Sequence, residues 1–278
     1  MLSQFTKMHG CGNDFVILDE RTEPFGLTPA RIAALANRRT GIGCDQLITL
    51  QHAPDGSNAD LAVRFFNPDG SEAGACGNGT RCAAALLYAE TDRPHLIIQT
   101  IAGNLPAQVH SSSRVTVNMG QPRLEWPDIP LSEPADTLHV PLAEGPVSDP
   151  AAVSMGNPHV TFFIADVAAI PVGQLGPVLE SHSLFSERAN IGFAEVQGPD
   201  RIRLRVWERG AGLTLACGSG ACAAVVNTHR RGLVGRTAAV ELDGGELAME
   251  WLPNNHVLMT GPVATAFTGE VDLSTYSA

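Results

Sequence analysis

The sequence has few basic residues, no closely spaced cysteine pair and no long hydrophobic run. Lys and Arg number 18 against 29 Asp and Glu, giving a formal net charge of −11. A nucleic acid is therefore not expected as a partner, because phosphate binding requires a basic face. The six cysteines include no CxxC pair, and no two histidines have metal-ligand spacing, so no metal site is expected. The longest apolar stretch, around Cys82 to Ala89, is far too short to span a bilayer.

The N-terminal residues also lack the apolar core of a signal peptide. We therefore expect a cytoplasmic protein with reduced thiols and no association with a membrane. Hydrophobic residues make up 44% and charged residues 17% of the chain, as in soluble globular enzymes. A length of 278 residues fits one large or two medium domains.

Two cysteines lie in two copies of one short pattern, which is the most informative feature present. The segment 75–79, Ala-Cys-Gly-Asn-Gly, matches the segment 216–220, Ala-Cys-Gly-Ser-Gly, at an offset of 217 − 76 = 141 residues. The match continues without a gap into the flanking segments, and such a repeat usually marks a repeated structural unit. Two thiols that face each other suit one reaction well, in which a proton leaves one face of a carbon and another returns to the opposite face.

The repeat predicts an α+β fold of two pseudo-twofold-related domains, each a mixed, mostly antiparallel sheet wrapped around a buried central helix. The central helices are predicted at 79–90 and 219–231, because these segments are apolar nearly all round. We expect residues 1–118 plus 263–278 to form an N-terminal domain carrying Cys76, and residues 119–262 a C-terminal domain carrying Cys217. The site would lie in the cleft between them. The segment 120–150 is rich in Pro, Glu and Asp and is interpreted as the inter-domain connection.

Other elements follow from local patterns. A helix is predicted at 28–36, with Thr28 as N-cap and Pro29 in the first turn. A further helix is predicted at 173–182. Strands are predicted at 15–18, 61–66, 96–100, 114–119, 160–164, 201–207, 240–242 and 257–259.

Each repeated cysteine opens a predicted helix, where the helix dipole and unpaired N–H groups favour a thiolate. The same N–H groups form an anion site, supplied by Gly77 and Asn78 in one copy and by Gly218 and Ser219 in the other. A substrate carboxylate held there would be stabilised as negative charge grows on it. The other four cysteines are expected to be buried small hydrophobes. A disulfide between Cys76 and Cys217 would inactivate such a site.

Several polar residues complete the candidate site, although each has an ordinary structural explanation. One group lies in glycine-rich turns, where asparagine often serves backbone geometry alone: Asn13, Gln46, Asn67, Asn157 and Asn190. Glu208 and Arg209 follow a predicted strand, where a surface ion pair is common. His159 is either a structural histidine or a residue that sets the protonation of Cys217.

Taken together, the motifs resemble the diaminopimelate epimerase family of pyridoxal-phosphate-independent amino-acid epimerases. They occur in family order at 9–15, 43–46, 66–72, 76–82, 155–159, 187–192, 208–212 and 216–223. Proline racemases resemble this superfamily too, but typically carry Gly-His-Gly after the first cysteine.

The resemblance implies conversion of LL-diaminopimelate to the meso form, for lysine and peptidoglycan precursors, by a homodimer without a cofactor. Cys76 and Cys217 would be the two acid/base residues, with assistance from His159 and Glu208. The implied substrate contacts are Asn13, Gln46, Asn67, Gly77, Asn78, Asn157, Asn190, Glu208, Arg209, Gly218 and Ser219.

The chain departs from the family at two informative positions. Leu213 stands where the family often has Glu, and Phe267 aligns with a tyrosine often found at the dimer contact. Three other functions are compatible with parts of the sequence: epimerisation of a different amino acid, hydrolysis by one thiol with His159, and amino-acid binding with inert cysteines. A matched second cysteine speaks against the hydrolase.

Overall fold

The computed structural model describes residues 2–276, which form two compact units. The first unit extends to Val117 and resumes at Gly261, and the second is Asn118–Thr260. These limits lie one residue (117 against 118) and two residues (261 against 263) from the domain boundaries expected from the repeat.

Among its described residues, the first unit contains two α-helices, a 3-10 helix and a larger number of strands. The helices are α1 (Pro29–Ala36), α2 (Gly77–Thr91) and η2 (Leu273–Tyr276). The strands are β1 (Leu2–Gly10), β2 (Asn13–Asp19), β3 (Gln46–Gln51), β4 (Leu61–Phe66), β5 (Glu72–Ala73), β6 (His95–Thr100), β7 (Gly103–Ser111), β8 (Arg114–Asn118) and β19 (Ala264–Asp272).

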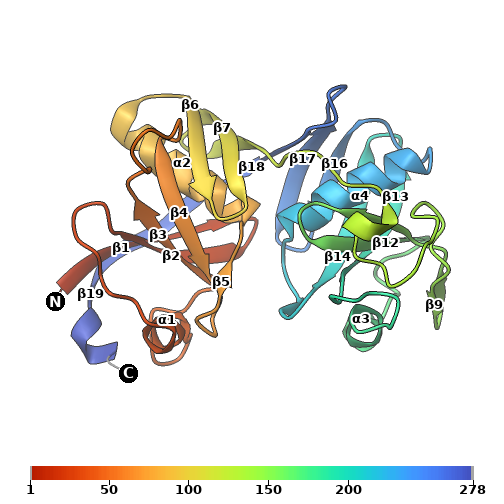
Figure 1. Ribbon diagram of the computed structural model, residues 1–278, viewed down its shortest axis with the longest axis horizontal. Coiled ribbons are helices and arrows are strands. Elements are labelled where there is room, and N and C mark those ends of the chain that lie inside the picture. Colours follow the sequence, from red (N-terminus) through yellow and green to blue (C-terminus); the bar gives the residue numbers. More distant parts are fainter. Residues whose placement is uncertain (1, 277–278) are drawn as a thin grey trace. The chain divides into compact units, whose positions relative to one another are not determined.

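The second unit is built from elements of the same kinds (Figure 1). Its helices are η1 (Trp126–Asp128), α3 (Val172–Glu180) and α4 (Gly218–Arg230). Its strands are β9 (Ala143–Glu144), β10 (Val147–Ser148), β11 (Ala151–Ser154), β12 (Pro158–Ile164), β13 (Asn190–Gly198), β14 (Arg201–Glu208), β15 (Gly212–Leu213), β16 (Thr237–Leu242), β17 (Gly245–Trp251) and β18 (Val257–Pro262).

The two units share one topology. In the first, β2 pairs in parallel with β3 and β4 with β6, whereas β1–β2, β3–β4, β4–β5, β6–β7 and β7–β8 are antiparallel. In the second, β12–β13 and β14–β16 are the parallel pairs and the corresponding remaining pairs are antiparallel. The mixed, mostly antiparallel α+β fold predicted from the repeat is confirmed. The tail strand β19 pairs with β1 of the first unit.

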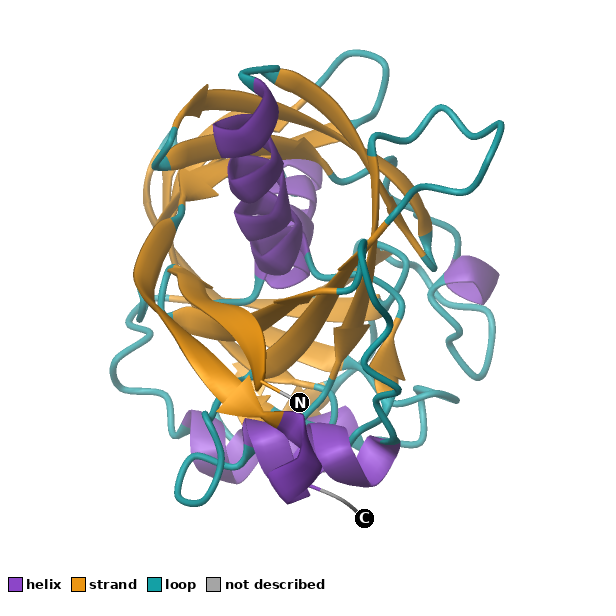
Figure 2. Ribbon diagram, turned by 90° about the vertical axis from the view of Figure 1, so that its left-hand side faces the viewer, coloured by secondary structure: helices purple, strands orange, loops and turns teal. Residues whose placement is uncertain are grey.

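A buried helix lies inside the strands of each unit. In Figure 2 the first unit faces the viewer, and its strands curve around a central helix. This helix, α2, contacts β1, β4, β6 and β7, while α4 contacts strands β11 to β14, β16 and β17. Small residues permit this packing: a Cβ at Gly79 would lie 2.6 Å from the ring of Phe65 and 2.9 Å from Ile48 Cδ1. Both helices begin earlier than predicted, at Gly77 and Gly218, because the cysteine itself is the N-cap.

The interpretation of 120–150 as an inter-domain connection was wrong. The whole segment belongs to the second unit. Its widely spaced apolar residues, among them Ile129, Leu131, Val140 and Leu142, are buried in a core that also contains Phe162. The prolines and acidic residues between them gave the segment a linker-like composition, but the apolar side chains pack as a cover on the sheet.

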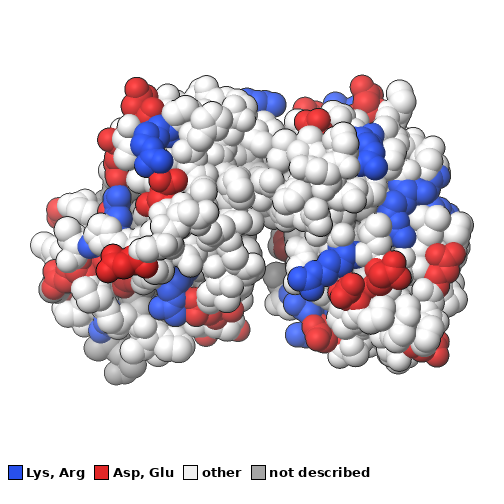
Figure 3. Space-filling model, turned by 45° about the horizontal axis from the view of Figure 1, so that its top comes forward, with Lys and Arg blue, Asp and Glu red and all other residues white. Residues whose placement is uncertain are grey.

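Charged side chains of both signs lie next to one another over much of the surface in Figure 3. On the second unit, for example, Arg201 contacts Glu241 and Glu246, with N–O distances of 2.8 and 3.0 Å. Such paired charges do not form the basic field that binds a phosphate backbone. Within residues 2–276 no helix combines the length and apolar character needed to cross a membrane.

Helix α3 offers a matched test of packing at the edge of the second unit. A Cβ at Gly176 would lie 2.3 Å from the Trp207 ring, whereas a Cβ at Gly173 of the same helix meets open space. We expect Gly176→Ala to destabilise the protein by about 1–3 kcal/mol through overpacking. Gly173→Ala should stabilise it by up to about 1 kcal/mol through helix propensity. Urea unfolding of both variants measures the difference, and equal effects would contradict this packing.

Candidate active site

Cys76 is the N-cap residue of α2 in the first unit. Its backbone is extended, with φ −143° and ψ 110°, and its Sγ accepts a hydrogen bond from Gly79 N at 3.5 Å. The thiol lies 3.9 Å from Asn13 Oδ1, and Asn78 Nδ2 donates to the same oxygen at 3.1 Å. Thr80 N bonds the carbonyl oxygen of Cys76 at 2.8 Å, which starts the helix at this residue. The half-buried thiol is therefore fixed at the positive end of the helix dipole.

Two other predicted residues of the first unit form a pair. Gln46 Nε2 donates to Asn67 Oδ1 at 3.0 Å, and Asn67 Nδ2 donates to Ser71 Oγ at 3.1 Å. Gln46 is the first residue of β3, as Asn13 is of β2 and Asn190 of β13. The expectation that these three residues lie in turns was therefore wrong. Each begins a strand, so its position is set by the sheet.

A charged cluster supports the start of β2, where Asn13 lies. Asn13 Nδ2 donates to Asp45 Oδ2 at 3.0 Å, and the neighbouring Asp14 carboxylate contacts Lys7 and Arg38, both at 2.5 Å. Burial alone would raise the pKa of Asp14, but hydrogen bonds from Arg38 and Lys7 outweigh it and hold that pKa well below its usual range. The ionised cluster anchors β2 beside the loop that leads into β3.

Cys217 is the N-cap of α4 in the second unit and has nearly the same backbone geometry as Cys76. Its φ is −120° and its ψ 108°, and its Sγ accepts from Gly220 N at 3.3 Å. Burial raises the pKa of this thiol well above its ordinary value, as do the negative charge of Glu208 and a hydrogen bond with its carboxylate. The side chain is 4% exposed. Cys217 is therefore a protonated thiol at neutral pH.

His159 is linked to Cys217 through the hydroxyl of Ser219. Its Nε2 lies 3.0 Å from Ser219 Oγ and 3.0 Å from Asn157 Oδ1, and Ser219 Oγ lies 3.7 Å from Cys217 Sγ. Burial, with a smaller contribution from the charge of Arg209, lowers the pKa of His159 to about 3. The ring is therefore neutral at physiological pH and acts in this network as a hydrogen-bonding group.

Asn190 and Arg209 hold two neighbouring loops of the second unit together. Arg209 N donates to Asn190 Oδ1 at 2.9 Å, and Asn190 Nδ2 donates to Pro158 O at 2.8 Å. The Arg209 guanidinium donates to Glu187 O at 2.9 Å and lies 3.9 Å from the Glu187 carboxylate. The sequence alone would allow a simple surface ion pair between Glu208 and Arg209. In the structure Arg209 contacts Asn190 and Glu187 instead.

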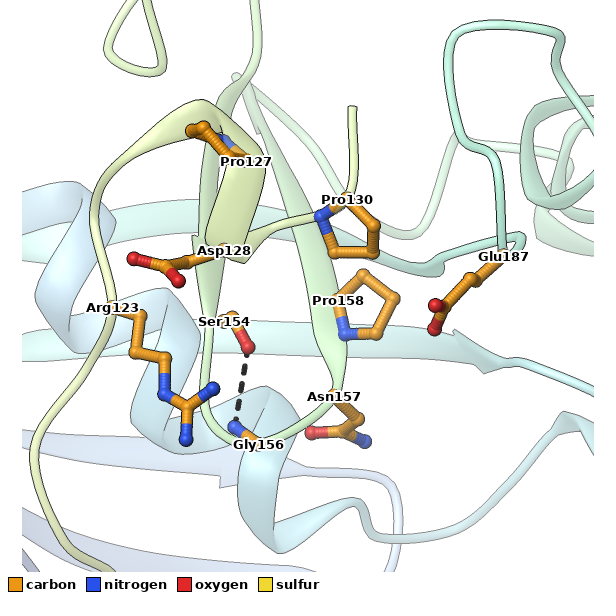
Figure 4. A pocket seen from close by; sticks show the side chains of 9 residues that line it. All are labelled: Arg123, Pro127, Asp128, Pro130, Ser154, Gly156, Asn157, Pro158 and Glu187. Atoms are coloured by element: carbon orange, nitrogen blue, oxygen red, sulfur yellow. Dashed lines mark hydrogen bonds between the residues drawn. The ribbon is translucent and has the colours of Figure 1, made fainter. Parts of the chain in front are cut away.

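An open pocket of about 260 Å³ borders this half of the site (Figure 4). Its lining includes Asn157 and Glu187, with Arg123 and Asp128 on the opposite side. The loop beneath it is closed by a hydrogen bond of 3.3 Å from Gly156 N to Ser154 Oγ. Asn157 therefore lies between this pocket and the network that leads to Cys217.

The two half-sites differ at corresponding positions of the repeat. At the offset of 141, Asn67 of the first unit corresponds to Glu208 of the second, and Asn78 to Ser219. The strand register gives one more pair: Phe15 is opposite Gln46 in β2–β3, as His159 is opposite Asn190 in β12–β13. At these corresponding positions, the titratable side chains, His159 and Glu208, thus fall in the second half-site.

Sequence reasoning missed Thr214, whose hydroxyl donates a short hydrogen bond to the Glu208 carboxylate. The residue lies between Leu213 and Leu215, which are 42% and 54% exposed. A polar residue flanked by exposed leucines just before the Cys217 motif was the available signal. With Leu213 in place of the family's common glutamate, Thr214 remains as a partner that holds Glu208.

The charge of Glu208 should be measurable at Cys217. Glu208→Gln removes a negative charge beside the thiol, so the pKa of Cys217 should fall toward its ordinary value. At a fixed mildly alkaline pH, we expect Cys217 alkylation to become about tenfold faster, because a larger fraction of the thiol is ionised. Mass spectrometry of each cysteine after timed iodoacetamide treatment gives the rates. Glu187→Gln, whose carboxylate contacts Arg209 instead, is the control, and an unchanged rate in Glu208→Gln would contradict the assignment.

Comparisons with known proteins agree with these motifs. The family model described as diaminopimelate epimerase matches residues 5–125 and 151–266. The diaminopimelate epimerase of Acidiphilium cryptum is 59% identical over 268 residues, covering 96% of each chain. That of Rhodospirillum centenum is 55% identical, covering 98% of this chain and 93% of the relative.

Solved structures share the fold at low sequence identity. A probable proline racemase from Agrobacterium radiobacter has a TM-score of 0.71 at 17% identity, covering 98% of this chain and 93% of that one. A hydroxyproline epimerase from Agrobacterium vitis has a TM-score of 0.68 at 16% identity, covering 97% and 92%. These likenesses concern the fold alone. The family-model match over most of the chain and the close relatives show that the chain belongs to the diaminopimelate epimerase family.

Proposed function

We propose that this protein interconverts LL- and meso-2,6-diaminopimelate, as an isomerase that supplies lysine and peptidoglycan precursors. The observation that carries the proposal is the pair of N-cap cysteines, one in each unit, with matching backbone geometry and matching N–H donors. A reaction that needs two bases on opposite faces of one carbon accounts for both copies. Hydrolysis by a single thiol accounts for only one.

The proposed chemistry moves two protons and needs no other reactant. A Cys76 thiolate takes the α-proton, and the electron pair of the broken C–H bond delocalises into the carboxylate. The Cys217 thiol then gives its proton to the opposite face, leaving a Cys76 thiol and a Cys217 thiolate. The protonated state of Cys217 described above supports its part as the first donor, and the reverse reaction exchanges the two parts.

Recognition would use the two helix ends and the polar loops. The N–H groups of Gly77, Asn78, Gly218 and Ser219 would bind the reacting carboxylate, because the first N–H groups of a helix have no acceptor within it. Arg209 and the asparagines would bind the distal amino-acid end, which presents both a carboxylate and an ammonium group. Asn13, Gln46 and Glu208 complete the proposed contacts.

We also propose that the enzyme is a cytoplasmic homodimer. Phe267 on β19 is 50% exposed, and its ring meets Phe5 edge-on with centroids 5.9 Å apart. An exposed aromatic residue at the position of the family's dimer tyrosine supports β19 as the contact surface. Biosynthesis of lysine precursors supports the location.

Each thiol can be tested separately by proton NMR with LL-diaminopimelate in D2O. The reduced wild-type protein, without added cofactor, should exchange an α-proton and form the meso isomer. Cys76→Ala and Cys217→Ala should each lower epimerisation by at least about 10³-fold, since each removes a required acid/base group. Either variant should still eliminate a leaving group from a suitable substrate analogue, because one base remains. Normal epimerisation by either variant would refute the two-base proposal.

The dimer is tested by Phe267→Asp. A carboxylate at the proposed contact should shift sedimentation from a dimer to a monomer at micromolar concentration, because burying an uncompensated charge is costly. Phe267→Tyr serves as the control, since it keeps the ring. Sedimentation of wild type as a monomer would refute the proposal.

A further inference from the structure

Glu180, the last residue of α3, is a buried carboxylate that none of the sequence motifs includes. It is 7% exposed. A negative charge at the C-terminal end of a helix opposes the helix dipole, so the position is electrostatically unfavourable by itself. The residue must therefore be held there by other contacts.

Those contacts lie at the end of β14, in the turn after it and in the loop before β13, next to proposed substrate-binding residues. Glu180 Oε1 accepts from Gly210 N at 2.9 Å and from Arg188 Nη1 at 3.0 Å, and Oε2 accepts from Trp207 Nε1 at 2.7 Å. The main-chain oxygen of Glu180 accepts from Ala189 N at 3.2 Å.

The donors flank the site residues on both loops. Trp207 and Gly210 stand on either side of Glu208 and Arg209, and Arg188 and Ala189 immediately precede Asn190. Asn190 and Arg209 are in turn joined by the 2.9 Å bond from Arg209 N to Asn190 Oδ1. One carboxylate thus connects the ends of both loops.

We propose that Glu180 is a positioning residue that fixes Glu208, Arg209 and Asn190 for recognition of the distal end of the substrate. It acts through the backbone of the two loops and touches no reacting atom. Its effect on turnover rests on the proposed function, whereas its hold on the loops does not.

The packing around Trp207 makes this connection stiff. The Trp207 ring lies against α3 at Gly176 and against the loop at Gly212, where an added Cβ would lie 2.3 and 3.5 Å from it. With the ring confined, its Nε1–H can reach Glu180 in one geometry. A shift of about 1 Å in a binding group can cost roughly 100-fold in rate, so such confinement matters for the site.

The test compares Glu180→Gln with Glu195→Gln in the full-length protein. Glu195 is a matched control, because its carboxylate also accepts a backbone N–H, from Val167 at 2.9 Å, but holds a different loop. Glutamine at 180 keeps the shape, yet turns an amide N–H2 toward donors that need an acceptor. We expect kcat/KM for LL-diaminopimelate to fall about 10- to 100-fold, mainly through KM. The kcat/KM of Glu195→Gln should stay within about twofold of the wild-type value, since this variant leaves the substrate loops in place. Its Tm should fall by about as much as that of Glu180→Gln.

Hydrogen exchange gives a readout that does not depend on turnover. In Glu180→Gln the amide of Gly210 should exchange at least about tenfold faster, because its acceptor is the substituted carboxylate. Trp207→Phe, which keeps the ring and removes one donor, should give a smaller KM increase. If the wild type lacks epimerase activity, the proposed function is refuted. Hydrogen exchange of the Gly210 amide still tests whether Glu180 holds the loop in place. Unchanged exchange, or equal KM values in the two Glu→Gln variants of an active enzyme, would overturn the proposal.

Discussion

The structure depends on one constraint repeated in each unit: a helix must begin at a cysteine while enclosed by strands. A helix start leaves N–H groups without acceptors inside the helix, and here the cysteine sulfur accepts one of them, from Gly79 or Gly220. Enclosure favours small or apolar residues along the helix, and a polar side chain inside the sheet needs its own partner, as Asn227 has in Ala151 O and Thr161 Oγ1. The same helix N-terminus that satisfies one N–H group with the cysteine sulfur also places that sulfur beside further N–H donors, where both can contact a substrate.

The two copies of the duplicated unit differ at positions next to the thiols. Asn67 corresponds to Glu208, so a neutral amide in one half-site is a carboxylate in the other. A carboxylate beside a buried thiol keeps that thiol protonated. The backbone geometry of the cysteines, by contrast, is nearly the same. The two halves therefore share the positions of the thiols but surround them with different polar groups.

Much of this arrangement could be predicted from the sequence, because its signals are local or periodic. The offset of 141 between Cys76 and Cys217 gave the repeat, and the apolar segments after them gave the central helices. The prediction for the segment 120–150 was wrong because its buried residues, such as Ile129 and Val140, are too widely spaced to show the periodicity of a strand or a helix. Likewise, His159 reaches Cys217 through Ser219, 60 residues away along the chain. Such bonds depend on strand register, which local patterns do not determine.

The site therefore combines two kinds of support with different physical origins. The thiols are placed by helix starts, which short glycine-rich motifs encode directly. The residues proposed to bind the distal end lie at strand ends and in the adjoining turns, which need an anchor from elsewhere in the unit. Glu180 provides it with one carboxylate that accepts from Trp207, Arg188 and Gly210. Since a buried carboxylate left without these donors would be strongly destabilising, folding of the unit and ordering of the recognition loops are coupled: neither the helix end nor the loops can be satisfied unless both are in place.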